Sequence, residues 1–152
     1  MNNINDMQIG KAGEYLVCAD LIARGFIAFP SEQGLPYDVV LDAGGRLLKV
    51  QVKTTRTHKQ TPQRVSNVNT YAFNIKRCGN KNRALHTNES CDIFALVALD
   101  EKQIAYMKNS DVKQTMFFRV ESMRGTYRDE NINAPIRGRY LSDLTLEDAL
   151  CR

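Results

Sequence analysis

The sequence predicts an α/β (α+β) domain built around a central β-sheet. Its 152 residues are about the length of one domain, which is enough chain to bury a core without disulfide bonds. A helical period runs through the first 25 residues, and short alternating or apolar segments separated by turn residues fill most of the rest. A helix, then several strands and then mixed structure is the order expected of this fold class.

Residues 6–25 are predicted to form the first helix. Apolar side chains recur there at helical spacing, at Ile9, Ala12, Leu16, Ala19 and Ala23. Asn5 or Asp6 can cap its start, and Gly25 ends it. Glu14 lies in line with apolar residues rather than on the outer face, and a carboxylate in such a place is costly unless something pairs with it.

Seven segments are predicted to be strands: 26–29, 37–42, 47–55, 71–76, 92–99, 103–107 and 115–120. Residues 56–69 and 78–90 are expected to be irregular, the second as a long basic loop. A short helix is expected at 144–150, capped by Ser142 or Asp143.

The charge of the chain is unevenly distributed. Ten of the 21 basic residues and none of the 17 acidic residues lie between Ala43 and Asn88. A sharply basic segment in an otherwise acidic chain is typical of a protein that binds a nucleic-acid backbone. The alternative is a basic surface that is merely solvated.

The composition also bears on the cellular compartment. The chain has no run of about 18 apolar residues and so no membrane span, and its first residues lack the pattern of a signal peptide. Its four cysteines are scattered without a CxxC pair, so we expect reduced thiols rather than a disulfide framework or a zinc site. A cytoplasmic protein is therefore expected.

Residues 44–45 are a Gly-Gly pair, which favours a two-residue hairpin turn. Pairing outward from that turn places Asp38 directly opposite Gln51, with side chains about 5 Å apart at Cβ. Val50 and Val52 then point to the other face, into the core. A three-residue turn would instead put Asp38 and Gln51 on opposite faces, so this prediction depends on the turn.

Lys53 shares the face of Asp38 and Gln51, and Glu14 lies on a helix that can pack over the same sheet. Two carboxylates and an amide oxygen are hard ligands that suit Mg²⁺. A lysine beside such a metal can stabilise the charge of a phosphorane or help to orient and deprotonate an attacking water. The pattern fits phosphodiester hydrolysis, and the alternative is a surface hairpin with ordinary polar residues.

The order of these motifs resembles the PD-(D/E)XK nuclease superfamily. Residues 36–38 (PYD), residues 51–53 (QVK) after a hairpin, and a preceding helix that carries Glu14 correspond to its motif, and the likeness covers residues 9–107. Within the superfamily the chain is most similar to the small endonucleases encoded in group I introns of cyanobacteria, and archaeal Holliday junction resolvases share the core. The resemblance implies a restriction-endonuclease-like core with a central mixed sheet flanked by helices.

The resemblance also implies roles for individual residues. Asp38 would bridge the metal ions, Glu14 and Gln51 would complete the ligand shell, and Lys53 would assist the nucleophile. The carbonyl of Val52 is a further candidate ligand. Gln51 departs from the usual acid, which removes one negative charge and means slower cleavage or an inactive site kept for binding; the intron branch also carries Gln there, which favours activity.

DNA contacts are expected on both sides of the predicted site. Candidates for binding phosphates or bases, in the segment after Lys53 and in the loops, are Gln33, Thr54, Thr55, Arg56, His58, Lys59, Arg77, Asn80, Lys81 and Arg83.

The sequence thus predicts one nuclease domain over residues 1–152, with a core at 6–107 and a C-terminal extension at 108–152 for oligomer or DNA contacts. The expected activity is Mg²⁺-dependent cleavage of double-stranded DNA, of the site-specific homing type. The alternatives are a Holliday junction resolvase or restriction-type nuclease on the same core, and a catalytically inactive DNA-binding protein. Because one site cuts one strand, a homodimer or homotetramer is expected.

Overall fold

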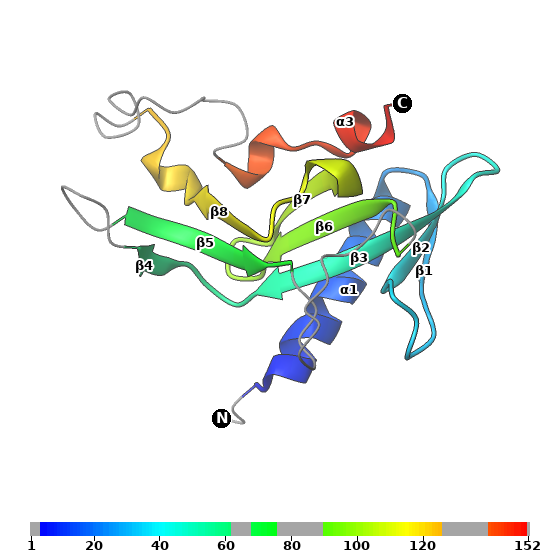
Figure 1. The fold of residues 1–152 in the computed structure, drawn as a ribbon, viewed down its shortest axis with the longest axis horizontal. Helices are drawn as coiled ribbons and strands as arrows, with labels where there is room; N and C mark the ends of the chain where they lie inside the picture. Colours follow the sequence, from blue (N-terminus) through cyan, green and yellow to red (C-terminus); the bar gives the residue numbers. More distant parts are fainter. Residues whose placement is uncertain (1–3, 62–67, 76–89, 126–139, 152) are drawn as a thin grey trace.

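The computed structural model describes residues 4–61, 68–75, 90–125 and 140–151, and it has the α/β architecture that the sequence predicts (Figure 1). Its helices and strands are α1 (Asp6–Ala23), β1 (Ile27–Pro30), β2 (Val39–Asp42), β3 (Leu47–Thr55), β4 (Lys59–Thr61), β5 (Val68–Asn74), β6 (Ile93–Ala98), β7 (Gln103–Lys108), β8 (Thr115–Arg119) and α3 (Leu146–Leu150). Three 3₁₀ turns are η1 (Asn109–Asp111), η2 (Glu121–Met123) and η3 (Leu141–Asp143).

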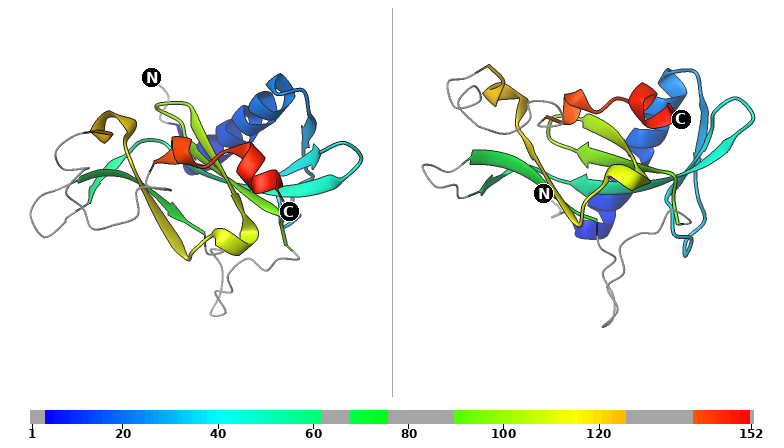
Figure 2. Two further views of the ribbon diagram at one scale, coloured as in Figure 1. Left: turned by 90° about the horizontal axis from the view of Figure 1, so that it is seen from above. Right: turned by 45° about the horizontal axis from the view of Figure 1, so that its top comes forward.

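The strands form two sheets. The larger has the order β1-β2-β3-β6-β7, and β3 runs parallel to β6 while the other neighbours are antiparallel. This mixed sheet confirms the fold that the sequence predicts. The smaller sheet, β4-β5-β8, lies at the opposite end of the molecule from the β2–β3 hairpin turn (Figures 1 and 2).

Helix α1 covers one face of the larger sheet. Asn5 rather than Asp6 caps it, because the Asn5 side chain accepts a hydrogen bond of 2.9 Å from the backbone N–H of Gln8. Its buried residues Val17 and Leu21 pack in a core with Val50 and Val52 of β3, among other residues. The alternation predicted for β3 is therefore confirmed: its even-numbered residues point toward α1.

The backbone of α1 comes unusually close to β3 at Gly13. A Cβ atom at this position would lie 1.9 Å from the Thr54 Oγ1 atom, and 3.0 Å from its Cβ atom. Only glycine allows this approach. Gly13 therefore sets how closely the helix sits on the strand, and Glu14 is the next residue.

A second core lies between the other face of β6 and the smaller sheet. Phe94 and Leu96 of β6 pack there with Tyr71 and Phe73 of β5 and Phe118 of β8. All five side chains are buried. The strand β5 thereby lies near the end of β3, beside the face that carries Gln51 and Lys53.

The chain after residue 107 contributes to both cores. Leu146 and Ala149 of α3 join the first core, and Phe118 and Leu141 join the second. The described part of 108–152 is thus packed into the same body as the strands before it. Its predicted contribution to oligomer or DNA contacts stays a prediction.

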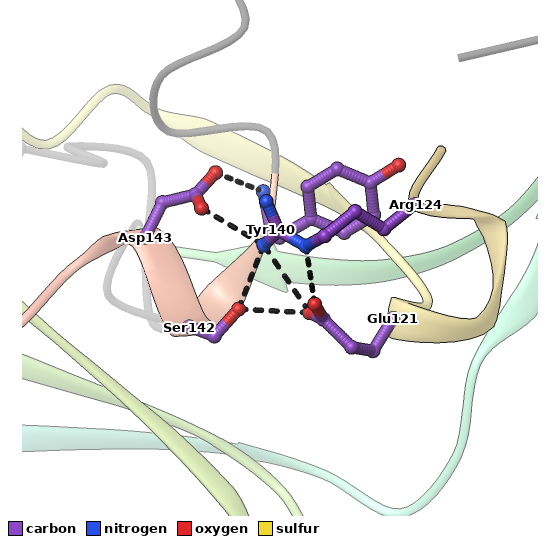
Figure 3. A network of polar contacts seen from close by, with 5 residues as sticks. All are labelled: Glu121, Arg124, Tyr140, Ser142 and Asp143. Carbon is purple, nitrogen blue, oxygen red and sulfur yellow. Dashed lines mark hydrogen bonds and ion pairs between the residues drawn. The ribbon is translucent and has the colours of Figure 1, made fainter. Parts of the chain in front are cut away.

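A polar network joins η2 to η3 (Figure 3). The Arg124 guanidinium lies 4.0 Å from the centre of the Tyr140 ring and donates hydrogen bonds of 2.9 Å to Ser142 and 2.8 Å to Asp143. Arg124 also pairs with Glu121, and this contact lowers the pKa of the Glu121 carboxyl. The network thus connects the two segments that flank residues 126–139.

Two local predictions were wrong. Residues 56–69 are not irregular throughout, because β4 lies there and β5 begins at Val68. The last helix is capped by Thr145, whose hydroxyl accepts a hydrogen bond of 3.2 Å from the N–H of Asp148. The Asp143 carboxylate instead accepts hydrogen bonds from Arg124 and from the N–H of Tyr140.

Among the described residues, Cys18, Cys91 and Cys151 are free thiols, and the first two are buried. Burial raises the pKa of the Cys91 thiol to about 11. Cys78 lies outside the described residues. None of the helices in the described residues is long and apolar enough to cross a membrane.

Candidate active site

The β2–β3 hairpin has the register that the sequence predicts. Gly44 and Gly45 form the turn with φ of +70° and +91°, and Val39 pairs with Val50. Positive φ at both central residues is the signature of a type I′ turn, which glycine adopts without strain. The two-residue turn places Asp38 and Gln51 on the same face.

Asp38 is bound by two groups of β3. The side-chain nitrogen of Gln51 donates a short hydrogen bond to the Asp38 Oδ2 atom, and the backbone N–H of Val52 donates to the same oxygen at 2.7 Å. The Gln51 side chain is buried, with 8 % of the residue exposed. The predicted contact between Asp38 and Gln51 is therefore present in the structure.

The backbone of β3 indicates where the Val52 carbonyl points. The Val50 carbonyl accepts from the Asp38 N–H on the β2 side, whereas the Lys49 carbonyl accepts from the Asp92 N–H on the β6 side. Backbone groups of successive strand residues alternate in this way, and the N–H and C=O of one residue point to the same side. The Val52 carbonyl therefore points to the β2 side of β3, the side on which Asp38 lies.

Several charges act on the Asp38 carboxyl. Burial raises its pKa, the hydrogen bond from Val52 opposes this, and the Glu14 carboxylate raises it further. The ammonium groups of Lys53 and Lys11 act in the opposite direction. Glu14 of α1 and Lys53 of β3 thus lie near enough to Asp38, just before β2, for their charges to act on its carboxyl.

Glu14 has a partner that the sequence analysis missed. The Lys11 Nζ atom lies 2.5 Å from the Glu14 Oε2 atom, and the Glu14 side chain is only 18 % exposed. The i,i+3 spacing on a predicted helix was the available signal. The ion pair with Lys11 provides the partner that a carboxylate among apolar residues requires.

The donor set fits a magnesium ion. Glu14 and Asp38 supply carboxylates whose mutual repulsion a cation would relieve, and the Val52 carbonyl points the same way. Gln51 presents its amide nitrogen to Asp38, and a half-turn of that amide brings its oxygen there instead. The described residues contain no group of three His, Cys, Asp or Glu side chains that could hold a metal ion, and the third side chain of the donor set is the amide of Gln51.

Some of the predicted DNA contacts lie on the surface. Gln33, Arg56 and Lys59 are exposed, and the half-buried Thr55 donates a hydrogen bond of 3.2 Å to the backbone carbonyl two residues on. The remaining candidates of the basic loop lie outside the described residues; they are Arg77, Asn80, Lys81 and Arg83.

Two other predicted contacts are turned toward the protein. The Thr54 hydroxyl is buried against Gly13, so the predicted phosphate contact of this side chain is not supported. His58 lies with its Nδ1 atom 3.6 Å from Asp100 and its ring edge-on to Tyr71. Tyr71 also donates a hydrogen bond of 2.9 Å to Asp100, so His58 borders a polar cluster of the fold.

The mixed sheet, the helix that carries Glu14 and the grouping of Asp38, Gln51 and Lys53 are the arrangement that the sequence predicts for a nuclease of the restriction-endonuclease-like class. The family model of the PD-(D/E)XK endonucleases matches residues 4–134. The chain therefore belongs to the PD-(D/E)XK endonuclease family and is an endonuclease.

A solved structure has the same fold. The chain is similar to the bacterial homing endonuclease I-Ssp6803I with a TM-score of 0.61 and 15 % sequence identity, over 82 % of this chain and 84 % of that one. No curated protein sequence matches the chain.

Proposed function

We propose that this endonuclease hydrolyses double-stranded DNA at specific sites in a Mg²⁺-dependent reaction of the homing type. The observation that carries the proposal is the pairing of Asp38 with Gln51 and the Val52 N–H, beside Lys53 and within the field of Glu14. The similarity of the fold to that of a homing endonuclease supports the homing type.

Four groups would hold the magnesium ion: the carboxylates of Asp38 and Glu14, the amide oxygen of Gln51 and the carbonyl of Val52. Asp38 is fixed by its hydrogen bond to Val52, and Glu14 is fixed by the close seating of α1 at Gly13. When bound, the ion would polarise the scissile phosphate and lower the pKa of a water molecule.

Lys53 is the proposed partner of the attacking water. Its side chain is half-buried on the same face as Gln51, and its positive charge acts on Asp38. An ammonium group there can orient the water and stabilise the negative charge that develops on the phosphate oxygens. Lys53 therefore has a role in cleavage that a protein that only binds DNA would not need.

The substrate would run along the basic surface next to the site. The exposed Arg56 directly follows β3 and the exposed Lys59 begins β4, so they would hold phosphates that flank the scissile bond. Ten of the 21 basic residues fall in the segment 43–88, and binding should therefore weaken steeply as salt is added. The cytoplasmic location and the single-domain organisation remain predictions.

A cleavage assay tests the function. The wild type is incubated with Mg²⁺ and host genomic DNA, supercoiled plasmid or a synthetic four-way junction, with Lys53→Ala in parallel and the exposed Lys113→Ala as the matched control. We expect discrete duplex fragments from the wild type and from Lys113→Ala, none from Lys53→Ala, and none when the metal is chelated. DNA affinity of Lys53→Ala should stay close to that of the wild type.

Other outcomes separate the alternatives. Cleavage of the junction but not of the duplexes would identify a resolvase. Tight, salt-sensitive binding without cleavage of any substrate would make Gln51 the mark of an inactive site and would contradict the proposed activity. Unchanged cleavage by Lys53→Ala would show that the catalytic lysine is elsewhere.

A further inference from the structure

Lys11 is the more exposed partner in an ion pair with Glu14. Its side chain is 41 % exposed while that of Glu14 is 18 % exposed, and 2.5 Å separates the Lys11 Nζ and Glu14 Oε2 atoms. The ammonium also lies 5.8 Å from the centre of the Tyr15 ring. Lys11 is thus held between the edge of the site and an exposed aromatic ring.

The charge of Lys11 acts on both carboxylates of the site. The hydrogen bond with Glu14 is the largest cause of the raised pKa of Lys11, and Asp38 contributes to the same shift. In return, the Lys11 ammonium lowers the pKa of Asp38 against the effect of burial. The two residues that would bind a metal ion therefore already share a cation from the chain itself.

An ordinary surface pair does not account for this placement. Exposed i,i+3 ion pairs on helices gain little, because water screens both partners. Here the carboxylate is mostly buried and has a second carboxylate near it, so its negative charge is poorly solvated. A cation at this point stabilises the metal-free site.

We propose that Lys11 is the resident counterion of the Glu14–Asp38 carboxylate pair, and that a divalent cation binds by displacing the Lys11 ammonium from Glu14. This inference rests on the proposed function, because it takes Glu14 and Asp38 as the metal ligands. The lysine holds the two carboxylates together before the metal arrives, and it makes metal binding weaker than the ligand set alone would allow.

Metal affinity, measured by calorimetric titration of the full chain with Mg²⁺ and by electron paramagnetic resonance with Mn²⁺, tests the proposal without a cleavage readout. Lys11→Met keeps an unbranched side chain and removes the charge, and Lys11→Gln is a second neutral variant. Lys113→Met makes the same change of net charge on the connection between β7 and β8. Lys11→Arg keeps the positive charge at the site.

We expect both neutral variants at Lys11 to bind the metal more tightly than the wild type, on the order of tenfold, because one unit of repulsion near the cation is removed. Lys113→Met and Lys11→Arg should bind like the wild type. Equal or weaker binding by the neutral variants would overturn the inference, while metal binding by the wild type would leave the proposed function standing. Failure of every variant to bind metal would overturn both.

Discussion

The surroundings of Asp38 disfavour the ionised form of its carboxyl in the absence of a metal ion. Its carboxylate accepts hydrogen bonds from Gln51 and Val52, yet burial and Glu14 still raise its pKa. The folded, metal-free protein therefore holds a proton on Asp38 more tightly than the unfolded chain does. Over the interval between the ordinary and the raised pKa, the free energy of unfolding falls as the pH rises.

Metal binding should consequently release a proton from Asp38. A cation favours the ionised carboxylate, so Mg²⁺ affinity should drop as the pH falls through the raised pKa of this group. Calorimetric titration in two buffers with different ionisation enthalpies measures the protons released. We expect release on the acid side of neutrality from the wild type and much less from Asp38→Asn; an affinity that does not change with pH would contradict the assignment.

The sequence predicted the Asp38–Gln51 contact because a single local feature determines it. The Gly44–Gly45 turn fixes the register of the hairpin, and the register fixes which side chains are opposed. The same alternation could have corrected the prediction for Thr54, which shares the inward face of Val52 and is buried against α1. The role of α1 at that point was not visible in the sequence, because it depends on packing between distant segments.

At the level of elements, the seating of α1 on β3 positions Glu14. Gly13→Ala would add a Cβ atom that lies 1.9 Å from the Oγ1 atom and 3.0 Å from the Cβ atom of Thr54. Both distances are too short, so the helix or the Thr54 side chain must shift. Overpacking of this kind costs about 1–3 kcal/mol. We expect a lower free energy of unfolding in urea and weaker Mg²⁺ binding, because the helix that carries Glu14 must move away from the strand.

Gly10 provides a control on the same helix. A Cβ atom there would have no neighbour within 4 Å, so Gly10→Ala should stabilise the protein by roughly 0.5–1 kcal/mol through helix propensity alone. Its Mg²⁺ affinity should not change. Equal effects of the two substitutions would show that the close approach at Gly13 does not matter.

Elements with a strong local pattern were predicted best. The bounds of β3 were predicted correctly at 47–55, since alternation over nine residues is a clear signal. The strand β4 has only three residues and pairs with β5, whose other partner β8 lies more than 40 residues further along the chain. Such pairing has no local signature, and segment 56–69 was therefore expected to be irregular.

For the whole molecule, packing does not stop at the end of the predicted core. Phe118, Leu141 and Leu146 come after the predicted core of 6–107 but are all buried in the two cores. The Arg124 network adds polar contacts between η2 and η3 in the same region (Figure 3). The C-terminal residues thus help to hold β6 and β7, and β6 in turn pairs with β3, the strand that carries Gln51 and Lys53.

The number of active sites in the assembled enzyme determines how many DNA strands it can cut. One protomer of 17.2 kDa with one site cuts one strand, so cleavage of both strands requires at least two protomers in a symmetric assembly. Sedimentation equilibrium should give a mass of at least two protomers. Mixing the wild type with an excess of Lys53→Ala should then produce hybrids that have an active site for only one strand.

Supercoiled plasmid reports this directly, because a single cut gives the nicked circle and a double cut gives the linear form. We expect the nicked form to accumulate as Lys53→Ala is added, while an equal excess of Lys113→Ala leaves the linear product unchanged. If linear product only declines in proportion to the share of wild type, without a nicked intermediate, the protomers act independently. That result would contradict an obligate oligomer and would mean that one protomer cuts the two strands in turn.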